Sequence, residues 1–335
     1  MAAHGFLLVS DFIITDGWWI LDWLKEKEWG KIKYLTQQNG LYFQKYYYGM
    51  FMIFPDPNIA VKVLTFIDLY LLSIVAFLLL KQTGYFSSKE SLFVAIVSLT
   101  IPTVRVYGNA LPVSMYLSCY LLFLCCAYLA LRAEVRNGHM HTVLRVITLI
   151  GFFLSFSCGS LLVFYYGFFI AFMFYEMKRR NLSEFVLPWS WLARRIDYIV
   201  LPLIFWIWRR RFVPGIGVGE NYQQPSFDRV LEVPFEFVRL FEHTIPEQLL
   251  GGVSLLFTVP LFIGIVGLCL SYIMARLIYR YYLADYEKEN HTSTLSIFIF
   301  SIILLFVAVF PYFATDYSPA PDGFNSRHAL LMSIP

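Results

Sequence analysis

Charged side chains are scarce in this sequence. Only 15% of its 335 residues are charged, whereas soluble domains carry about 25%. A soluble fold could not cover a hydrophobic fraction of 59% with so few charges. The net charge of +3 gives no reason to expect nucleic-acid binding. The composition therefore excludes an ordinary soluble domain and favours a protein embedded in a lipid bilayer.

Cysteine is also rare, and the usual catalytic motifs are missing. The five cysteines all lie in apolar runs without metal-ligand spacing, so we interpret them as small packing residues. No Ser/His/Asp, HExxH or CxxC arrangement is present, which leaves a hydrolase or dehydrogenase of the soluble type without support. His139 and His141 lack an acidic or cysteine partner nearby, so we interpret them as solvated loop residues. No metal site is predicted.

Long apolar runs dominate what the sequence does contain. A membrane helix needs about 20 apolar residues, and the runs predict eight spans plus the start of another. Residues 143–177 are too long for one span, so we divide them near Ser157–Ser160 into two short helices. The predicted fold is an all-α, polytopic transmembrane bundle with short and interfacial helices. The predicted spans are residues 59–80, 92–104, 111–131, 143–177 as a pair, 198–208, 249–272 and 294–313.

We treat residues 1–335 as one membrane domain. Its predicted parts are an outer amphipathic and aromatic segment, six spans, an outer loop, two spans, a second outer loop and the start of a further span. They cover residues 1–58, 59–208, 209–248, 249–313, 314–328 and 329–335, respectively. We expect the chain to be truncated at both ends, with one helix missing before Met1 and at least one after Pro335.

Basic residues in short loops set the predicted orientation. Segment 178–195 holds five Lys and Arg residues and is therefore assigned to the cytoplasm, together with 132–145 and 276–288. Residues 1–58, 209–248 and 316–327 then face outward. This scheme depends on dividing residues 143–177 into two spans. A single span there would reverse the predicted orientation of every segment on one side of it. We predict a multi-pass protein of the bacterial inner (plasma) membrane.

Three carboxylates stand among tryptophans in the predicted outer segment. They are Asp11, Asp16 and Asp22, with Trp18, Trp19 and Trp23 close by. A carboxylate near a low-dielectric region has a raised pKa and can act as a base. An interfacial helix with its aspartates in water would explain the same pattern, and both interpretations stay open.

Basic residues gather at the same predicted face. Arg105 follows a short span, and Arg209, Arg210 and Arg211 break the rule that positive charge lies inside. One reason is a phosphate at membrane level, which arginine binds through two parallel hydrogen bonds. Ordinary lipid headgroups, or an error in the topology, would also explain them.

Arg327 and His328 open a predicted helix. Cations are unfavourable there because a helix N-terminus prefers anions. Their position fits a bound anion, or a surface cap formed by Ser326.

The first clear span contains two charged residues. Lys62 lies near the helix end, where its side chain can extend to the interface. Asp68 lies deeper, with no charged residue three or four positions away, so a tertiary partner or a cavity must explain it. Before this span, 37–40 and 46–48 are rich in amides and tyrosines, which suit either a sugar or an aromatic belt.

These features together resemble the GT-C superfamily, the multi-span glycosyltransferases that use polyprenyl-phosphate sugars. The resemblance is architectural and covers most of the chain, but the adjacent acidic pair common in the superfamily is absent. It implies that Asp11 or Asp16 acts as the base and that Arg327 holds the lipid phosphate. Further substrate-binding candidates are Asp22, Arg105, Arg209, Arg210, Arg211 and His328.

The sequence thus predicts a membrane glycosyltransferase of the hexosyltransferase type. It would move a sugar from a polyprenyl-phosphate carrier to a hydroxyl of a glycan or another acceptor at the outer membrane face. A divalent cation is left open as a cofactor. Two alternatives are a transporter or lipid-carrier flippase, motivated by Lys62 and Asp68, and a non-catalytic membrane subunit.

Overall fold

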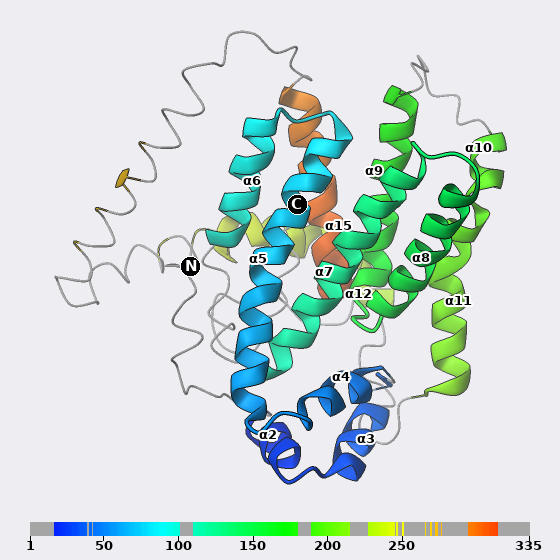
Figure 1. Cartoon of the computed structure of the whole chain (residues 1–335). Helices are drawn as coiled ribbons and strands as arrows, with labels where there is room; N and C mark the ends of the chain where they lie inside the picture. The colour runs from blue at the N-terminus through cyan, green and yellow to red at the C-terminus, as the bar shows by residue number, and fades with distance from the viewer. Residues whose placement is uncertain are drawn as a thin grey trace. The chain divides into compact units, whose positions relative to one another are not determined.

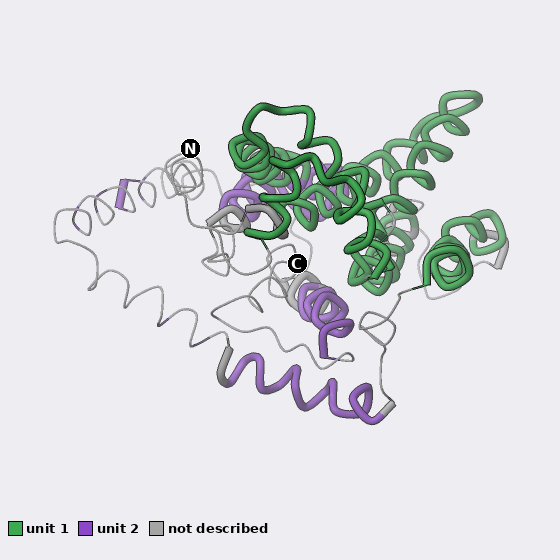
Figure 2. Tube along the Cα trace, turned by 90° about the horizontal axis from the view of Figure 1, so that it is seen from below, with its two compact units in different colours: residues 1–75, 106–226 green, residues 76–105, 227–335 purple. Residues whose placement is uncertain are grey.

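The structure is a computed structural model that describes most of the first 214 residues and parts of the remaining chain. The described residues are 17–38, 40–41, 43–100, 110–179, 189–214, 227–244, 246, 250, 265, 269, 272–273, 276 and 294–313. All regular elements within these ranges are helices, which confirms the predicted all-α class. The chain divides into two compact units, residues 1–75 with 106–226 and residues 76–105 with 227–335 (Figure 2).

Within the described residues, two helices are long and apolar enough to cross a membrane, judged by length and composition. They are α5 (Pro57–Thr83) and residues 114–133 of α7 (Ala110–Ala133). One side of α5 exposes apolar side chains at intervals of three or four residues, as contact with lipid requires. These are Ile59, Val63, Ile67, Leu71 and Ile74.

Local sequence explains where α5 and the helix that follows it begin. The Asp56 carboxylate accepts hydrogen bonds from the backbone N–H groups of Asn58 and Ile59, at 2.9 and 3.3 Å, and so caps α5. The helix α6 (Ser88–Thr100) begins with a capping box, in which Ser87 and Glu90 each accept a hydrogen bond from the other's backbone N–H.

Most of the other predicted spans coincide with shorter helices. These are α6, α8 (His139–Ser155), α9 (Leu161–Arg179), α11 (Ile196–Phe212) and α15 (Thr294–Phe313). Helix α11 begins two residues earlier and ends four residues later than the predicted span 198–208. Most of the span predicted at 249–272 lies outside the described residues. The number of spans, eight, therefore stays a prediction.

The division of residues 143–177 into two helices is confirmed. Helix α8 ends at Ser155, and α9 begins at Leu161 after a turn. The chain reverses at this turn, because Phe152 and Phe156 before it both contact Tyr165 after it, with ring centroids 4.9 and 5.3 Å apart.

Helix α7 packs closely against this hairpin. Its Phe123 ring lies 5.2 Å from Phe152 of α8 and 6.4 Å from Tyr165 of α9, both edge to face. Edge-to-face pairs of this kind contribute about 0.5–1.5 kcal/mol each beyond their buried area. The backbones of α7 and α8 approach closely at Gly151, because a Cβ there would overlap with the sulfur of Cys126.

The part of the segment 1–58 that the structure describes forms three helices with a shared core. We call α2 (Gly17–Lys25), α3 (Trp29–Gln38) and α4 (Gln44–Phe51) the end layer. It lies across one end of the first unit (Figure 1). Its core joins all three helices to the start of α5 and consists of Ile20, Leu21, Leu24, Ile32, Tyr48, Phe51 and Val61. An outer segment rich in aromatic residues was expected here, but the sequence did not predict this packed layer.

In the second unit, α12 (Phe227–Arg239) packs on α15. Val233 and Leu240 on or just after α12 contact Val309 and Phe313 of α15. Leu231 and Phe235 remain exposed on α12, which is strongly amphipathic. An amphipathic helix of this kind is typical of the interfacial helices that the predicted fold includes.

The close approach at Gly151 gives the first testable prediction. We expect Gly151→Ala to lower the free energy of unfolding by about 1–3 kcal/mol, because the added methyl group overpacks the α7–α8 contact. Gly30→Ala is the matched control, since nothing lies within 4 Å of a Cβ at Gly30. That change should stabilise α3 by about 0.5–1 kcal/mol. Unfolding in lipid–detergent micelles measures both, and equal effects would contradict the close approach.

Candidate functional site

Aromatic residues fasten the end layer to the helix bundle. Phe43, just before α4, stacks on Trp208 of α11 with ring centroids 5.4 Å apart and planes 12° from parallel. The same ring meets Phe153 of α8 edge to face at 6.4 Å. The end layer and the C-terminal end of α11 therefore lie together.

Arg209 lies against the turn that ends α3. The backbone N–H groups of Gly40 and Leu41 donate to the carbonyl groups of Gln37 and Thr36, at 3.1 and 2.9 Å, which is a Schellman motif. Gly40 has a φ of 62°, which favours glycine. A Cβ on Gly40 would lie 3.4 Å from both Nε and Nη2 of Arg209. The turn at Gly40 thus lies next to the Arg209 guanidinium on one side.

Two further cations are buried near this end. Lys45 of α4 is 6% exposed and Lys62 of α5 is 5% exposed. The Lys45 ammonium group lies 4.8 Å from the centre of the Tyr46 ring, a cation–π contact. The partial burial of Arg209 lowers the pKa of its guanidinium. Three cationic side chains at or next to the end layer are therefore shielded from water, fully or in part.

Asp68 finds its partner on another helix. Its carboxylate accepts a short hydrogen bond from the Ser118 hydroxyl of α7. Ser118 in turn lies 3.3 Å from the Tyr47 hydroxyl of α4. Burial raises the pKa of Tyr47 well above its usual range, so this hydroxyl keeps its proton at neutral pH. The tertiary partner that the sequence required for Asp68 is thus Ser118, with Tyr47 behind it.

The energetics of Asp68 are unfavourable for a purely structural role. It is 4% exposed and lies about 16 Å along α5 from the helix start. An aspartate at the centre of a membrane helix costs about 2.5–3.5 kcal/mol. A hydrogen bond between membrane helices returns about 0.6 kcal/mol on average. The bond to Ser118 therefore recovers only part of the cost.

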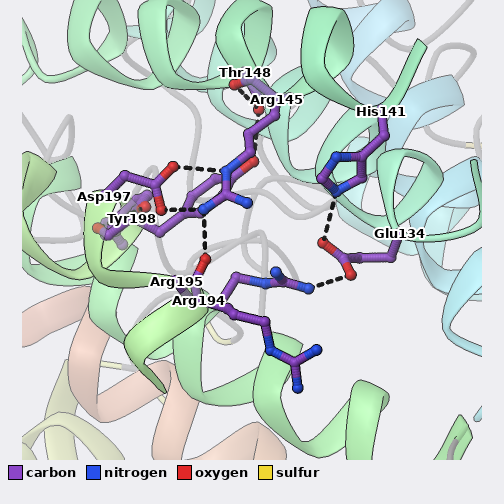
Figure 3. Close-up of polar contacts among 9 residues, drawn as sticks. Glu134, His141, Arg145, Thr148, Arg194, Arg195, Asp197 and Tyr198 are labelled. Atoms are coloured by element: carbon purple, nitrogen blue, oxygen red, sulfur yellow. Dashed lines mark hydrogen bonds and ion pairs between the residues drawn. The ribbon is translucent and has the colours of Figure 1, made fainter. Parts of the chain in front are cut away.

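A network of ion pairs occupies the opposite end of the first unit (Figure 3). Arg145 of α8 donates to both carboxylate oxygens of Asp197, at 2.6 and 2.7 Å, and to the carbonyl of Arg194 at 2.5 Å. Nearby, Arg195 pairs with Glu134, whose other oxygen lies 3.9 Å from Nε2 of His141.

The Arg195–Glu134 pair is deeply buried. The two side chains are 6% and 9% exposed. Burial raises the pKa of Glu134, while the charge of Arg195 acts in the opposite direction. The network joins residues 134–145 to residues 194–197, two segments predicted to share the cytoplasmic side. Which side of a membrane these segments face stays a prediction.

The structure describes only some of the predicted site residues. Asp11, Asp16, Arg105, Arg327 and His328 lie outside the described residues. The structure therefore does not test the proposed base, nor the match of Arg327 to a phosphate-binding arginine.

The remaining predicted site residues differ in exposure: three are exposed, and Arg209 is partly buried. Asp22 is exposed on α2, while Arg209 is partly buried beside Gly40. Arg210 and Arg211 are exposed, and Arg210 lies over the Trp206 ring at 5.3 Å. All three arginines belong to the last turn of α11, not to the start of an outer loop as predicted. A helix C-terminus favours cations, which explains why the helix continues through them.

Sequence reasoning missed several polar partners. Ser118 was not selected, although Ser114 and Ser118 are four residues apart on one face of a predicted span. Glu134 and Asp197 were also missed. Each is an acidic residue beside the end of a predicted span, in a segment where most charged residues are basic. That pattern could have indicated an ion pair.

Comparison with known proteins identifies no relative. No family model, curated protein or solved structure matches the chain. The resemblance to the GT-C superfamily therefore neither gains nor loses support.

The buried ion pair gives a second prediction. We expect Arg195→Met to lower the free energy of unfolding by about 3–5 kcal/mol, because it leaves the Glu134 carboxylate buried without its cation. The control is Arg229→Met, which breaks the pair with Glu232 on α12, where the side chains are 45% and 54% exposed. This change should cost less than about 1 kcal/mol. Thermal unfolding of both variants measures the difference, and a similar small effect in both would show that Glu134 is solvated.

Proposed function

We propose that the protein is a membrane glycosyltransferase that uses a polyprenyl-phosphate sugar as its donor. The reaction would take place at the end layer, on the outer membrane face. The acceptor is a hydroxyl group of a glycan or a similar molecule. The observation that carries the proposal is the position of Arg209, at the junction of α11 and the end layer.

Arg209 suits the recognition of a lipid phosphate. Its guanidinium has five N–H donors in a planar fork, so it can contact the Gly40 turn and an anion together. Charge-assisted hydrogen bonds are strong where water is largely excluded. Exposed Arg210 and Arg211 on the same turn add positive potential for attracting the anion. Trp18 and Trp19, exposed on α2, are residues typical of the headgroup region.

The chemistry follows from the polarity of the donor. The acceptor oxygen attacks the anomeric carbon of the sugar and forms the new glycosidic bond. The bond between that carbon and the phosphate oxygen breaks, and the phosphate leaves with the electron pair. Arg209 stabilises the developing charge on the leaving phosphate. Asp11 or Asp16, assigned by the resemblance alone, accepts the proton of the attacking hydroxyl.

A transporter or lipid-carrier flippase is the second candidate. It is favoured by Asp68, a carboxylate buried inside a helix long enough to span the membrane. This function would require Asp68 and would leave the outer carboxylates dispensable. The first candidate requires Arg209 and the outer carboxylates.

Binding of the carrier lipid tests the role of Arg209. We expect polyprenyl monophosphate to raise the melting temperature of the full chain in lipid nanodiscs, because a ligand at 100 times its Kd stabilises the folded state by about 2.7 kcal/mol. Polyprenol, which lacks the phosphate, should have little effect. Arg209→Gln should weaken binding of the phosphate at least about tenfold, which corresponds to about 1.4 kcal/mol.

The matched control for this experiment is Arg132→Gln. Arg132 lies in the last turn of α7, at the opposite end of the first unit, and its side chain is exposed. Its substitution should leave binding unchanged. Equal stabilisation by polyprenol, or equal loss of binding in both variants, would contradict a phosphate site at Arg209.

The outer carboxylates give a separate test of catalysis. We expect Asp11→Asn or Asp16→Asn to lower the transfer rate by about 100-fold or more, as loss of a general base does. Radiolabelled polyprenyl-phosphate hexoses serve as donors, with cell-envelope glycans as acceptors. Asp56→Asn is the control, because Asp56 is exposed and caps α5, a role that asparagine can also fill. Full transfer in both outer variants would rule this mechanism out.

A further inference from the structure

The hydrogen bonds around Asp68 have a fixed direction. Ser118 has one hydroxyl proton, and it donates this proton to the Asp68 carboxylate. In the 3.3 Å contact with Tyr47, Ser118 must therefore accept, so the Tyr47 hydroxyl is the donor. The three groups form one chain of O–H donors that runs from the end layer into the bundle and ends on a carboxylate oxygen.

A carboxylate at this position requires an explanation beyond packing. An asparagine would accept the same hydrogen bond through its amide oxygen without introducing a formal charge. Asp68 differs from such an amide chiefly in its ability to bind a proton. Burial makes that ability more consequential, because a charge held away from water is costly. The hydrogen bond to Ser118 therefore does not explain why an ionisable side chain occupies this position.

We propose that Asp68, Ser118 and Tyr47 form a proton-binding relay, in which Asp68 is the terminal acceptor for a proton that enters at the end layer. The ligand of this site is a proton delivered by a hydroxyl compound, either water or an alcohol. The relay depends on the geometry of α4, α5 and α7, and does not require that the protein transfers sugars.

The transfer is balanced at each oxygen. An O–H bond forms on Asp68 as the Ser118 O–H bond breaks, and Ser118 regains a proton from Tyr47. Tyr47 then takes a proton from a water or alcohol hydroxyl at the end layer. The net result is one proton on Asp68 and one hydroxide or alkoxide at the end layer. The reverse sequence returns the proton.

Few other titratable groups face this chain in the described part of the structure. Cys119 of α7 lies next to Ser118 and interacts electrostatically with both Asp68 and Tyr47. Ser114 of α7 also hydrogen-bonds with Tyr47 and offers a second hydroxyl. Lys62 is on the same helix as Asp68, six residues earlier, and therefore lies on a different part of its circumference.

Infrared spectroscopy of the full chain in lipid nanodiscs tests the relay without any sugar donor. We expect the C=O stretch of a protonated carboxylic acid to appear as the pH is lowered and to be lost in Asp68→Asn. Tyr47→Phe and Ser118→Ala each remove one hydroxyl, and each should shift the frequency or the titration midpoint of that band. Asp56→Asn removes an exposed carboxylate and should leave the band intact.

The relay is overturned if no titrating carboxylic-acid band is lost in Asp68→Asn, or if both hydroxyl variants leave the band unchanged. Circular dichroism establishes that each variant keeps its helices. If Asp68→Asn does not fold, titration of the wild type, Tyr47→Phe and Ser118→Ala decides between the same two outcomes. Because no sugar donor or carrier lipid is present, failure here is distinct from failure of the transferase proposal.

Discussion

The reversal of the chain at residues 156–160 is the constraint on which the first unit depends. Because α8 ends there and α9 returns antiparallel to it, the beginning of α8 and the end of α9 lie at the same end. This brings Arg145 within reach of Asp197, and leaves the other end open for the end layer. Were residues 143–177 one straight helix, these contacts could not form together.

The two ends of the unit are held by different kinds of interaction. At one end, two ion pairs join the end of α7 and the start of α8 to the start of α11. The Arg195–Glu134 pair is buried, so removing either partner would leave a buried charge without its counterion. At the other, aromatic rings attach the end layer, through Phe43 and Trp208. The end layer is thus attached by ring packing, whereas the far end is held by ion pairs.

The sequence predicted most helices because long apolar runs have few structural alternatives. The turn at Ser157–Ser160 was also predictable, since a single helix of that length would exceed the membrane. The end layer was not predictable in the same way. Its core depends on residues from four helices, such as Leu21, Ile32, Tyr48 and Val61, which no local pattern connects.

Prediction of the candidate site was limited by the same cause. The sequence identified Asp68 as a buried charge in need of a partner, but spacing along one helix cannot select Ser118 from the serines on other helices. It also placed Arg209 near the outer face. It did not show that Arg209 would lie against the turn at Gly40, which depends on how α3 meets α11.

The position of the relay bears on the choice between the two proposed functions. A proton-coupled transporter needs a path from one face to the other, whereas a transferase needs only a place for a proton near its reacting groups. Along α7, Phe123 follows Ser118 and comes before Glu134, and its ring packs against Phe152 and Tyr165. This aromatic cluster lies between the relay and the ion-pair network at the far end. A proton on Asp68 is thus better placed to return to the end layer than to cross the bundle, and this favours chemistry at the end layer over transport.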